Sequence, residues 1–437
     1  MSEEIDRPIA DFRRIADSLP GRHKWLQALR EDALRRFSET GYPTPRDEAW
    51  KYTNLTPFLL GKSFAPAIGG GEAAMAGLLD DFLFPDSAAP VLVFVDGFHV
   101  PGLSRTAGLP SGVMVASLGD VLRGTDDRDI ETFLTGHVPV EPRGFAQLNT
   151  AFMTDGACIR IPAGVAIERP IHLLYIVRSG AQPFAAYWRN LIAAAPGSRA
   201  TVVEHYVSVD GAQALTSAVT QCVLADGAAV EHYQLNEQGD GVYHFAGIHV
   251  HQTGASRYAS HNVQAGARLA RGDVHAVLAG QGSECTLNGL YLGRGRQHID
   301  NYTYIDHQVP RCTSRESYKG VLDDQSRGIF NGQIIVRQDA QRTDARQVNH
   351  NLLLSEDAEA DTRPQLLIYA DDVQCSHGST VGQLDRDALF YLRARGLDEA
   401  QARRMLVTAF AQDVVDRMSV EAVRRRLERL VAERLSH

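Results

Sequence analysis

A cysteine and a histidine stand two residues apart in the segment Gln374-Cys375-Ser-His377-Gly378. In a β-strand, residues i and i+2 point to the same face and lie about 6.5–7 Å apart. We therefore expect Cys375 and His377 to present a thiol and an imidazole on one surface. Sulfur and nitrogen donors of this kind bind iron, zinc and copper. Since a closed structural metal site needs about four ligands, the others must come from elsewhere in the fold or from a second protein.

The same pair also has a structural interpretation, which the residues alone leave open. Cysteine is often a small core residue, and a neighbouring histidine is often held by a hydrogen bond. The chain would then be a structural homodimer in which both residues only pack. Asp371 and Asp372, which precede the pair, are either turn residues or groups that orient an imidazole beside a metal.

Four other histidines lie in strand-like surroundings. His205 and His232 belong to two copies of Val-Glu-His-Tyr, and His249 and His251 are two residues apart. With 16 histidines in the chain, some such pairs arise by chance. We interpret these four as hydrogen-bonded polar groups lining the fold, with metal binding or proton transfer as the less favoured alternative.

Motifs for nucleotide and acyl chemistry are absent from the sequence. It contains no Gly-x-x-x-x-Gly-Lys-Ser/Thr loop, no strand-linked Gly-x-Gly-x-x-Gly and no Gly-x-Ser-x-Gly elbow. A carbohydrate-cleaving enzyme built on a β-helix remains an alternative, because such enzymes act through paired carboxylates. The candidate carboxylates are Asp300, Asp306, Asp323 and Asp324.

The composition is that of an ordinary globular protein with an acidic balance. Of the 437 residues, 44% are hydrophobic and 22% are charged, and the net charge is −9. A nucleic-acid partner is disfavoured, because affinity for nucleic acid depends on neutralising phosphates with Lys and Arg.

Cysteine usage and the first residues predict a cytoplasmic protein. Five cysteines are scattered without a Cys-x-x-Cys pair, which is typical of free thiols in a reducing compartment. The start, Met1-Ser-Glu-Glu, is acidic and lacks the apolar region of a signal peptide. No run reaches the ~18–20 apolar residues needed to cross a bilayer, so no membrane segment is expected.

Helical periodicity marks the first of three predicted regions, residues 1–89. Apolar residues at spacings of three and four predict one helix that ends at Pro20-Gly21 and a second that ends before Gly41. The stretch after residue 60 is rich in Gly and Ala, and we interpret it as a linker with a short helix around 73–82.

Residues 90–384 form the second predicted region, a β core. Short runs rich in Val, Ile, Thr and Tyr alternate with turn residues, as in Val91-Leu-Val-Phe-Val95. Such a length with little helical periodicity favours a solenoid over a sandwich. Val-Glu-His-Tyr recurs at an offset of 27, and Asn-Gly recurs at Gly289 and Gly332, an offset of 43. These offsets predict coils of roughly 20–25 residues.

The third predicted region, residues 385–437, is helical. Gly396 is expected to follow the end of one helix, and Asp398-Glu-Ala-Gln401 matches a capping box. An apolar stripe follows, made of Leu406, Phe410 and Val414. This stripe needs a surface to cover it, either the open end of the solenoid or another protein.

Two longer motifs resemble signatures of the SufB/SufD family, the scaffold proteins of iron–sulfur cluster assembly. The first runs from Gly41 to Thr53 and contains Gly-x-Pro-Thr followed by Glu-x-Trp-Lys-Tyr-Thr. The second runs from Asp361 to Gly378 and includes Asp-Thr-Arg-Pro and Cys-Ser-His-Gly. The resemblance covers essentially the whole chain, and the total length and the Cys-Ser-His-Gly context favour the SufD branch.

The resemblance implies a mainly β fold, a right-handed parallel β-helix flanked by N-terminal and C-terminal helices. It also implies two partners. The β-helix would pair with SufB, and the C-terminal helices would dock the ATPase SufC; the residues expected to contact SufC are Leu406, Phe410 and Val414. The chain itself would be a scaffold without catalytic activity, and a homodimer is an alternative state when the chain is alone.

The resemblance also implies a role for the pair on the second motif. His377 would lie at the interface with SufB and face a SufB cysteine, with a transient iron–sulfur cluster built between them. Cys375 would be a second ligand, because thiolates bind iron well. A site shared across an interface explains why one chain supplies too few ligands. The family complex is also associated with reduced flavin, although no residue of this sequence identifies a flavin site.

Overall fold

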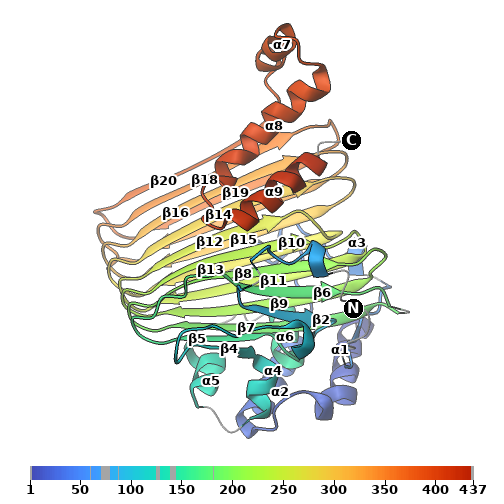
Figure 1. Cartoon of the computed structure of the whole chain (residues 1–437), viewed down its shortest axis with the longest axis vertical. Coiled ribbons are helices and arrows are strands. Elements are labelled where there is room, and N and C mark those ends of the chain that lie inside the picture. The colour runs from blue at the N-terminus through green and yellow to red at the C-terminus, as the bar shows by residue number, and fades with distance from the viewer. Residues whose placement is uncertain are drawn as a thin grey trace.

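The computed structural model describes most of the chain, as residues 2–59, 61–69, 79–86, 88–124, 128–137, 144–180 and 182–434. Its main body is a parallel β-solenoid of about eight turns, in which the chain alternates between two sheets (Figure 1). Helices from both ends of the chain cover the outer faces, so the predicted mainly β solenoid with flanking helices is confirmed. Of the short helix expected around 73–82, residues 73–78 lie outside the described residues, and Leu79–Asp81 form the 3-10 turn η3.

Each turn of the solenoid contributes one strand to each of two ten-stranded sheets. Sheet A contains, in spatial order, β4 (Met114–Ser117), β5 (Ala157–Ile161), β7 (Phe184–Ala194), β9 (Ala214–Leu224), β11 (Val242–Gln252), β13 (Leu269–Leu278), β15 (His298–His307), β17 (Arg327–Val336) and β19 (Glu359–Ile368), with β1 (Ala65–Pro66) beside β7. Sheet B contains β3 (Phe98–His99), β2 (Val91–Val95), β6 (Ile171–Val177), β8 (Arg199–Ser208), β10 (Ala229–Glu237), β12 (Arg257–Gln264), β14 (Glu284–Gly293), β16 (Thr313–Leu322), β18 (Asp344–Leu353) and β20 (Gln374–Gln383). The pairs β4–β5 and β2–β3 are antiparallel, and the other pairs are parallel.

Each coil is longer than the sequence repeats predicted. Tyr243 pairs with Leu269, 26 positions later, and Arg327 pairs with Glu359, 32 positions later. The expected coil of 20–25 residues is therefore wrong. One coil must hold two strands, commonly of 10 residues each, and the two turns that join them.

The repeated sequences do not mark equivalent positions either. Val203 pairs with Tyr233, so the two Val-Glu-His-Tyr copies are three residues out of register. Gly289 lies in sheet B, whereas Gly332 lies in sheet A. What recurs in every coil is the alternation of inward and outward side chains, and this alternation does not require any particular residue.

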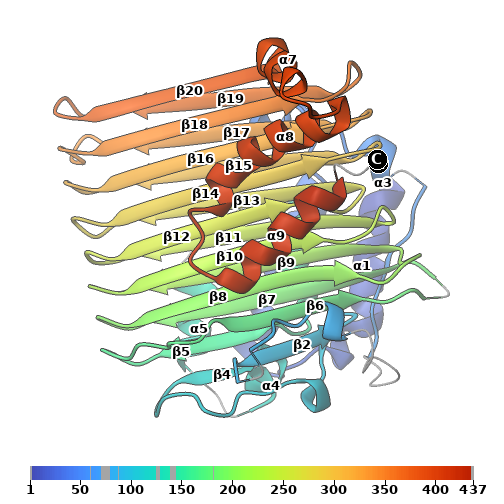
Figure 2. The same cartoon turned by 45° about the horizontal axis from the view of Figure 1, so that its top comes forward.

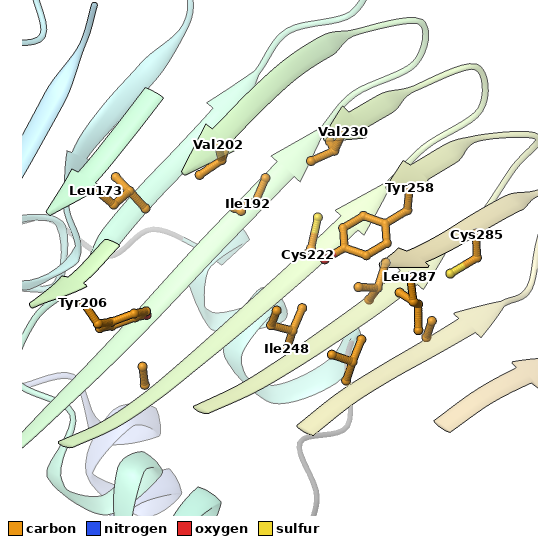
Figure 3. Packing of buried hydrophobic residues seen from close by; sticks show 14 of the residues in the cluster. Leu173, Ile192, Val202, Tyr206, Cys222, Val230, Ile248, Tyr258, Cys285 and Leu287 are labelled. Carbon is orange, nitrogen blue, oxygen red and sulfur yellow. The ribbon is translucent and has the colours of Figure 1, made fainter. Parts of the chain in front are cut away.

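Inward-pointing side chains fill the space between the two sheets. Figure 3 shows them projecting from neighbouring strands toward one another, among them Leu173, Ile192, Tyr206, Ile248 and Leu287. Their burial stabilises the fold by about 25 cal/mol per Å² of apolar surface removed from water. Cys222 and Cys285 belong to the same core, and burial raises the pKa of both thiols. These two cysteines are therefore packing residues.

Helices near the N-terminus cover the outer face of sheet A. They are α1 (Ser2–Ile15), η1 (Ala16–Ser18), α2 (Lys24–Thr40), η2 (Glu48–Trp50) and α3 (Thr56–Leu59). Together with α6 (Phe145–Phe152) they pack on Tyr187, Leu215 and Phe245 of the sheet. As predicted, the first helical segment ends before Pro20 and the second ends before Gly41, which has a φ of 67°.

Short helices also interrupt residues 90–384, and the sequence did not predict them. They are η4 (Pro101–Leu103), α4 (Leu118–Arg123), α5 (Arg128–Thr132), the π-helical turn η5 (Phe133–His137) and α6. The longest of them, α6, has 8 residues. A helix of two turns or fewer repeats its apolar face too few times to produce a recognisable period.

The described C-terminal region contains three helices: α7 (Arg386–Ala394), α8 (Glu399–Val415) and α9 (Glu421–Arg434). Asp398 and Gln401 form the predicted capping box, and Gly396 has the positive φ of 96° expected after a helix end. Helices α8 and α9 cross the strands of sheet B, while α7 extends past the last coil (Figures 1 and 2). No helix in the described part of the chain is long and apolar enough to cross a membrane.

The last coil, formed by β19 and β20, leaves one end of the solenoid open. Both strands are the outermost members of their sheets. Large hydrophobic side chains are exposed at this end, namely Leu367, Ile368, Tyr369 and Val381. These two edges have no strand neighbour among the described residues. A sheet edge of this kind with exposed apolar side chains favours strand pairing with another chain.

Candidate functional site

Cys375 and His377 lie on β20, at the open end of the solenoid. Their ladder partners on β18 are Ala345 and Gln347, which are both fully buried. Cys375 packs at the margin of the core, so this side of β20 faces the interior. His377 shares that side by strand alternation, and because no further coil covers β20 in the described part of the chain, its side chain is exposed. The two donors therefore stand on one face at the rim of the solenoid.

The Cys375 thiol is not activated by its surroundings. Partial burial raises its pKa, the carboxylate of Asp344 raises it further, and a backbone hydrogen bond with Ala345 offsets only part of this effect. The thiol is therefore protonated near neutral pH, and a metal ion must displace the proton in order to bind. No group of three or more His, Cys, Asp or Glu side chains in the described residues is placed to hold a metal ion. The pair can supply only part of a ligand set.

Asp372 takes part in the turn that leads into β20. Its backbone carbonyl accepts a hydrogen bond from the backbone N–H of Arg342 at 2.6 Å, and its carboxylate lies 3.6 Å from the Arg342 guanidinium. The turn interpretation accounts for Asp372 without any metal.

Of the other candidate histidines, His205, His232 and His249 are buried far from the rim, and His251 is half-buried on β11. His205 and His232 lie 3.1 Å from the carboxylates of Glu237 and Glu204 respectively. His249 is buried beneath the N-terminal helices, with its ring stacked on another histidine at 5.0 Å. These contacts match the interpretation of the histidines as hydrogen-bonded or packed polar groups.

The carboxylates considered for a carbohydrate-cleaving enzyme are engaged elsewhere. Asp300 is buried and lies 2.5 Å from the guanidinium of Arg271. Asp306 is held by Arg337 at 2.9 Å. Each of these two carboxylates is engaged in an ion pair within the fold, and this alternative is therefore disfavoured. The two remaining candidates lie in the turn after β16: Asp323 and Asp324.

The N-terminal motif, residues 41–53, packs across the outer face of sheet A, and we call this segment the N-terminal strap. The ring of Trp50 lies 3.8 Å below the Arg271 guanidinium, and the Thr53 hydroxyl donates a hydrogen bond to Asp300 at 2.5 Å. Glu48 forms an ion pair with Arg363 on β19. The two long motifs of the sequence therefore meet in space, and the first one contacts β19, the strand that precedes β20 in the last coil.

The apolar stripe of the C-terminal helices is mostly turned toward the solenoid. Val414 is fully buried against sheet B, and Phe410 is half-buried at the margin of the same cluster. Leu406 is half-buried. The large hydrophobic side chains that α7 and α8 expose are instead Phe390, Tyr391 and Met405. These residues lie outside the predicted apolar stripe, although two adjacent aromatic residues in a short amphipathic helix are a recognisable signal.

Comparisons with known proteins match both parts of the chain. The SufBD core domain of the SUF system for FeS cluster assembly matches residues 176–410, and the SufBD protein N-terminal region matches residues 19–173. The chain belongs to the SufBD family. Among SufBD proteins, it is 33% identical to the iron–sulfur cluster assembly protein SufD of Escherichia coli, over 92% of this chain and 91% of that protein. It is 30% identical to an iron–sulfur cluster assembly SufBD family protein of Synechocystis, over 98% of this chain and 95% of that protein.

A third relative, the SufD protein of Bacillus subtilis, is 26% identical over 94% of both chains. The SufBD core domain match contains both Cys375 and His377, together with α7 and most of α8. The resemblance drawn from the two sequence motifs is confirmed at the level of the SufBD family and its SufD members.

Proposed function

We propose that this SufBD family chain is a scaffold subunit for iron–sulfur cluster assembly and has no catalytic activity of its own. It would pair with SufB through the open end of the solenoid and dock the ATPase SufC through its C-terminal helices. The observation that carries this proposal is the incomplete ligand pair, Cys375 and His377, on the rim of an unpaired coil. The iron–sulfur cluster is the cargo of the scaffold, and a partner chain would supply its remaining ligands.

The open end suits a partner built on the same plan. Both sheets end in strands whose outer edges lack a neighbour among the described residues. A SufB solenoid that continued either sheet would satisfy those backbone groups and cover the exposed apolar side chains. The exposed set is Leu367, Ile368, Tyr369 and Val381. Such pairing would enclose His377 between the two chains.

The C-terminal helices suit the docking of a motor subunit. Phe390, Tyr391 and Met405 are exposed on α7 and the first half of α8. The second half of α8 is fixed to sheet B, where Lys319 lies 3.0 Å from Asp413 and Val414 is buried. Movement of SufC on the exposed part would be passed to the solenoid through this anchored part, which would open the interface to iron and sulfur.

The test is reconstitution of the complex. The chain is co-expressed with SufB and SufC, supplied with iron and sulfide without oxygen, and examined by absorbance spectroscopy. We expect His377→Ala to form the complex and lose the cluster band. The matched control is His350→Ala on the neighbouring strand, because that half-buried histidine points to the outer face and bonds Thr380 at 2.8 Å. The control should keep the band.

Two results would contradict the proposal. A full cluster band in His377→Ala would remove the ligand role of this residue. ATP hydrolysis by the purified chain alone would contradict a scaffold without catalytic activity.

A further inference from the structure

A line of polar side chains runs inward from His377 through two coils. The strand register pairs His377 of β20 with Gln347 of β18, and Gln347 with Glu316 of β16. Glu316 in turn pairs with Leu287, a member of the core between the sheets. Gln347 and Glu316 are almost completely buried, at 0% and 2% exposure. All three polar residues therefore point to the interior side of sheet B, one above the other.

The carboxamide of Gln347 is held in one orientation. Its Nε2 donates a hydrogen bond to the Glu316 carboxylate at 2.7 Å. Its Oε1 is buried and has no hydrogen-bond partner among the described residues. A buried acceptor without a partner costs about 1–3 kcal/mol, so its presence calls for an explanation.

The neighbouring sheet is shaped to admit this amide. A Cβ on Gly332 of β17 would lie 2.2 Å from the Nε2 of Gln347, so any larger residue would displace the side chain. The absence of a side chain at position 332 thus makes room for the amide in the interior.

Glu316 is suited to anchor the amide. Among the described residues, no Arg, Lys or His forms an ion pair with this carboxyl group, in contrast to Glu204, which lies 3.1 Å from His232. No cation in the described part of the chain competes with the amide of Gln347, whose Nε2 donates to this carboxyl group at 2.7 Å, and the side chain of Thr303 is its other hydrogen-bonding neighbour.

The imidazole of His377, in contrast, makes no hydrogen bond within the described residues. Adjacent strands lie about 4.8 Å apart, so its ring is within reach of the side chain of its ladder partner. A histidine that binds metal almost always donates its second ring N–H to an acceptor, which fixes the tautomer and the ring orientation. The unpartnered oxygen of Gln347 is such an acceptor.

We propose that Gln347, oriented by Glu316, is the positioning residue of His377: its carboxamide oxygen accepts the N–H of one ring nitrogen and leaves the lone pair of the other free for a metal. The significance of this bond for iron binding rests on the proposed function, but the bond itself can be measured in the chain alone. It requires a rotation of the exposed side chain of His377 toward its ladder partner.

The experiment is an NMR measurement of the tautomers of His377. The full chain is labelled with ¹⁵N in histidine, the signals of His377 are assigned by comparison with His377→Asn, and spectra are recorded well above the ordinary imidazole pKa of about 6.5. We expect one neutral tautomer to dominate in the wild-type chain. In Gln347→Met, which keeps the length but removes the acceptor, the tautomer ratio should shift roughly three- to tenfold, the loss of one hydrogen bond.

The matched control is Asn349→Leu. Asn349 is the next interior residue of β18 and is equally buried, but its ladder partner is Ser379. We expect this variant to leave the His377 ratio unchanged, and Glu316→Leu to shift it in the same direction as Gln347→Met. If Gln347→Met does not fold, Gln347→Leu replaces it.

An unchanged ratio in the Gln347 variant overturns the proposal, as does an equal shift in the Asn349 control. The outcome is independent of the cluster experiment. A cluster that survives His377→Ala while the tautomer shift is present would refute the ligand role and leave the positioning bond standing. Loss of the cluster in His377→Ala, together with an unchanged tautomer ratio in Gln347→Met, would support the ligand role of His377 and refute the positioning bond.

Discussion

Glu204 and Glu316 place carboxyl groups in the same solenoid interior but in opposite electrostatic surroundings. Burial on its own raises the pKa of Glu204, yet the charge and hydrogen bond of His232 more than offset it and leave the pKa at about 2. Burial also raises the pKa of Glu316, and the side-chain hydrogen bonds of Thr303 and Gln347 offset only part of this effect, so the pKa remains at about 7. The difference arises because an imidazole lies 3.1 Å from the carboxylate of Glu204, whereas no basic side chain among the described residues pairs with Glu316.

Glu316→Gln is expected to change how stability depends on pH. The pKa of Glu316 rises on folding from 4.5 to about 7, so the folded state binds the proton more tightly. The resulting stability is present below pH 4.5 and is lost as the pH rises through about 7. We expect the variant to exceed the wild type by about 1–3 kcal/mol at pH values above 7, with no such gain below pH 4.5.

Urea unfolding at a series of pH values tests this expectation. Glu356→Gln, at an exposed turn position, is the control and should follow the wild-type curve. The same dependence of unfolding free energy on pH in Glu316→Gln and the wild type would contradict the prediction.

Thiol labelling should single out Cys375. The other cysteines, at positions 158, 222, 285 and 312, are buried, whereas Cys375 is half-buried. We expect iodoacetamide to modify one thiol of the folded chain, faster as the pH rises because burial holds the pKa of that thiol above its usual value. Mass spectrometry of the labelled chain and of Cys375→Ser provides the measurement. Equal labelling of several cysteines in the folded chain would contradict the burial of Cys158, Cys222, Cys285 and Cys312.

Among the structural elements, the N-terminal strap depends on one buried guanidinium. Arg271 lies between Asp300 at 2.5 Å and Asp273 at 2.9 Å and stacks on Trp50. Arg271→Met would leave Asp300 buried without a counter-charge, and we expect a loss of about 3–5 kcal/mol in unfolding free energy. Limited proteolysis should then cut within residues 41–55, because the strap is released.

Arg35→Met serves as the control for the strap. Arg35 also has two acidic neighbours, but its side chain is 56% exposed, so we expect a change within about 0.5 kcal/mol. Equal effects of the two substitutions would contradict the anchoring role of Arg271.

Substitutions at two positions of helix α8 should have different effects, one on stability and the other on partner binding. Val414 is buried against sheet B and Met405 is 56% exposed. We expect Val414→Ala to lower the unfolding free energy by about 1–3 kcal/mol through cavity formation. Met405→Ala should leave stability unchanged and weaken SufC binding, measured by calorimetry. Unchanged SufC affinity in Met405→Ala would remove this surface from the proposed interface.

For the whole molecule, the stacking of coils predicts a gradient of local stability. Inner coils have a neighbour on each side, whereas β19 and β20 have one. In such arrays stability is approximately the sum of coil and interface terms. We expect hydrogen exchange to be fastest in β19 and β20, slowest in the strands from β8 to β14, and slower in β19 and β20 once SufB is added. Uniform exchange along the solenoid, or no protection on adding SufB, would contradict this arrangement.

Local sequence rules determined a large part of this protein. The ends of α2 and α8 could be predicted because Gly41 and the Asp398–Gln401 capping box act within one turn of their own helix. The solenoid could be predicted because short strand-like runs separated by turn residues can be recognised locally, and within each run successive side chains point alternately inward and outward. The Cys375–His377 pair could be selected because residues two apart on a strand share a face whatever the rest of the fold does.

Only the tertiary structure decided the relations between coils. The coil length depends on turns and packing across two sheets, which short repeats do not encode, so the predicted 20–25 residues were too few. The strand register places Glu316 and Gln347 beneath His377. The packing of helical segments on the two sheets buries Val414 and joins Glu48 to Arg363. These contacts link residues tens to hundreds of positions apart. They depend on how all the coils pack together, and a pattern within a few neighbouring residues does not determine that packing.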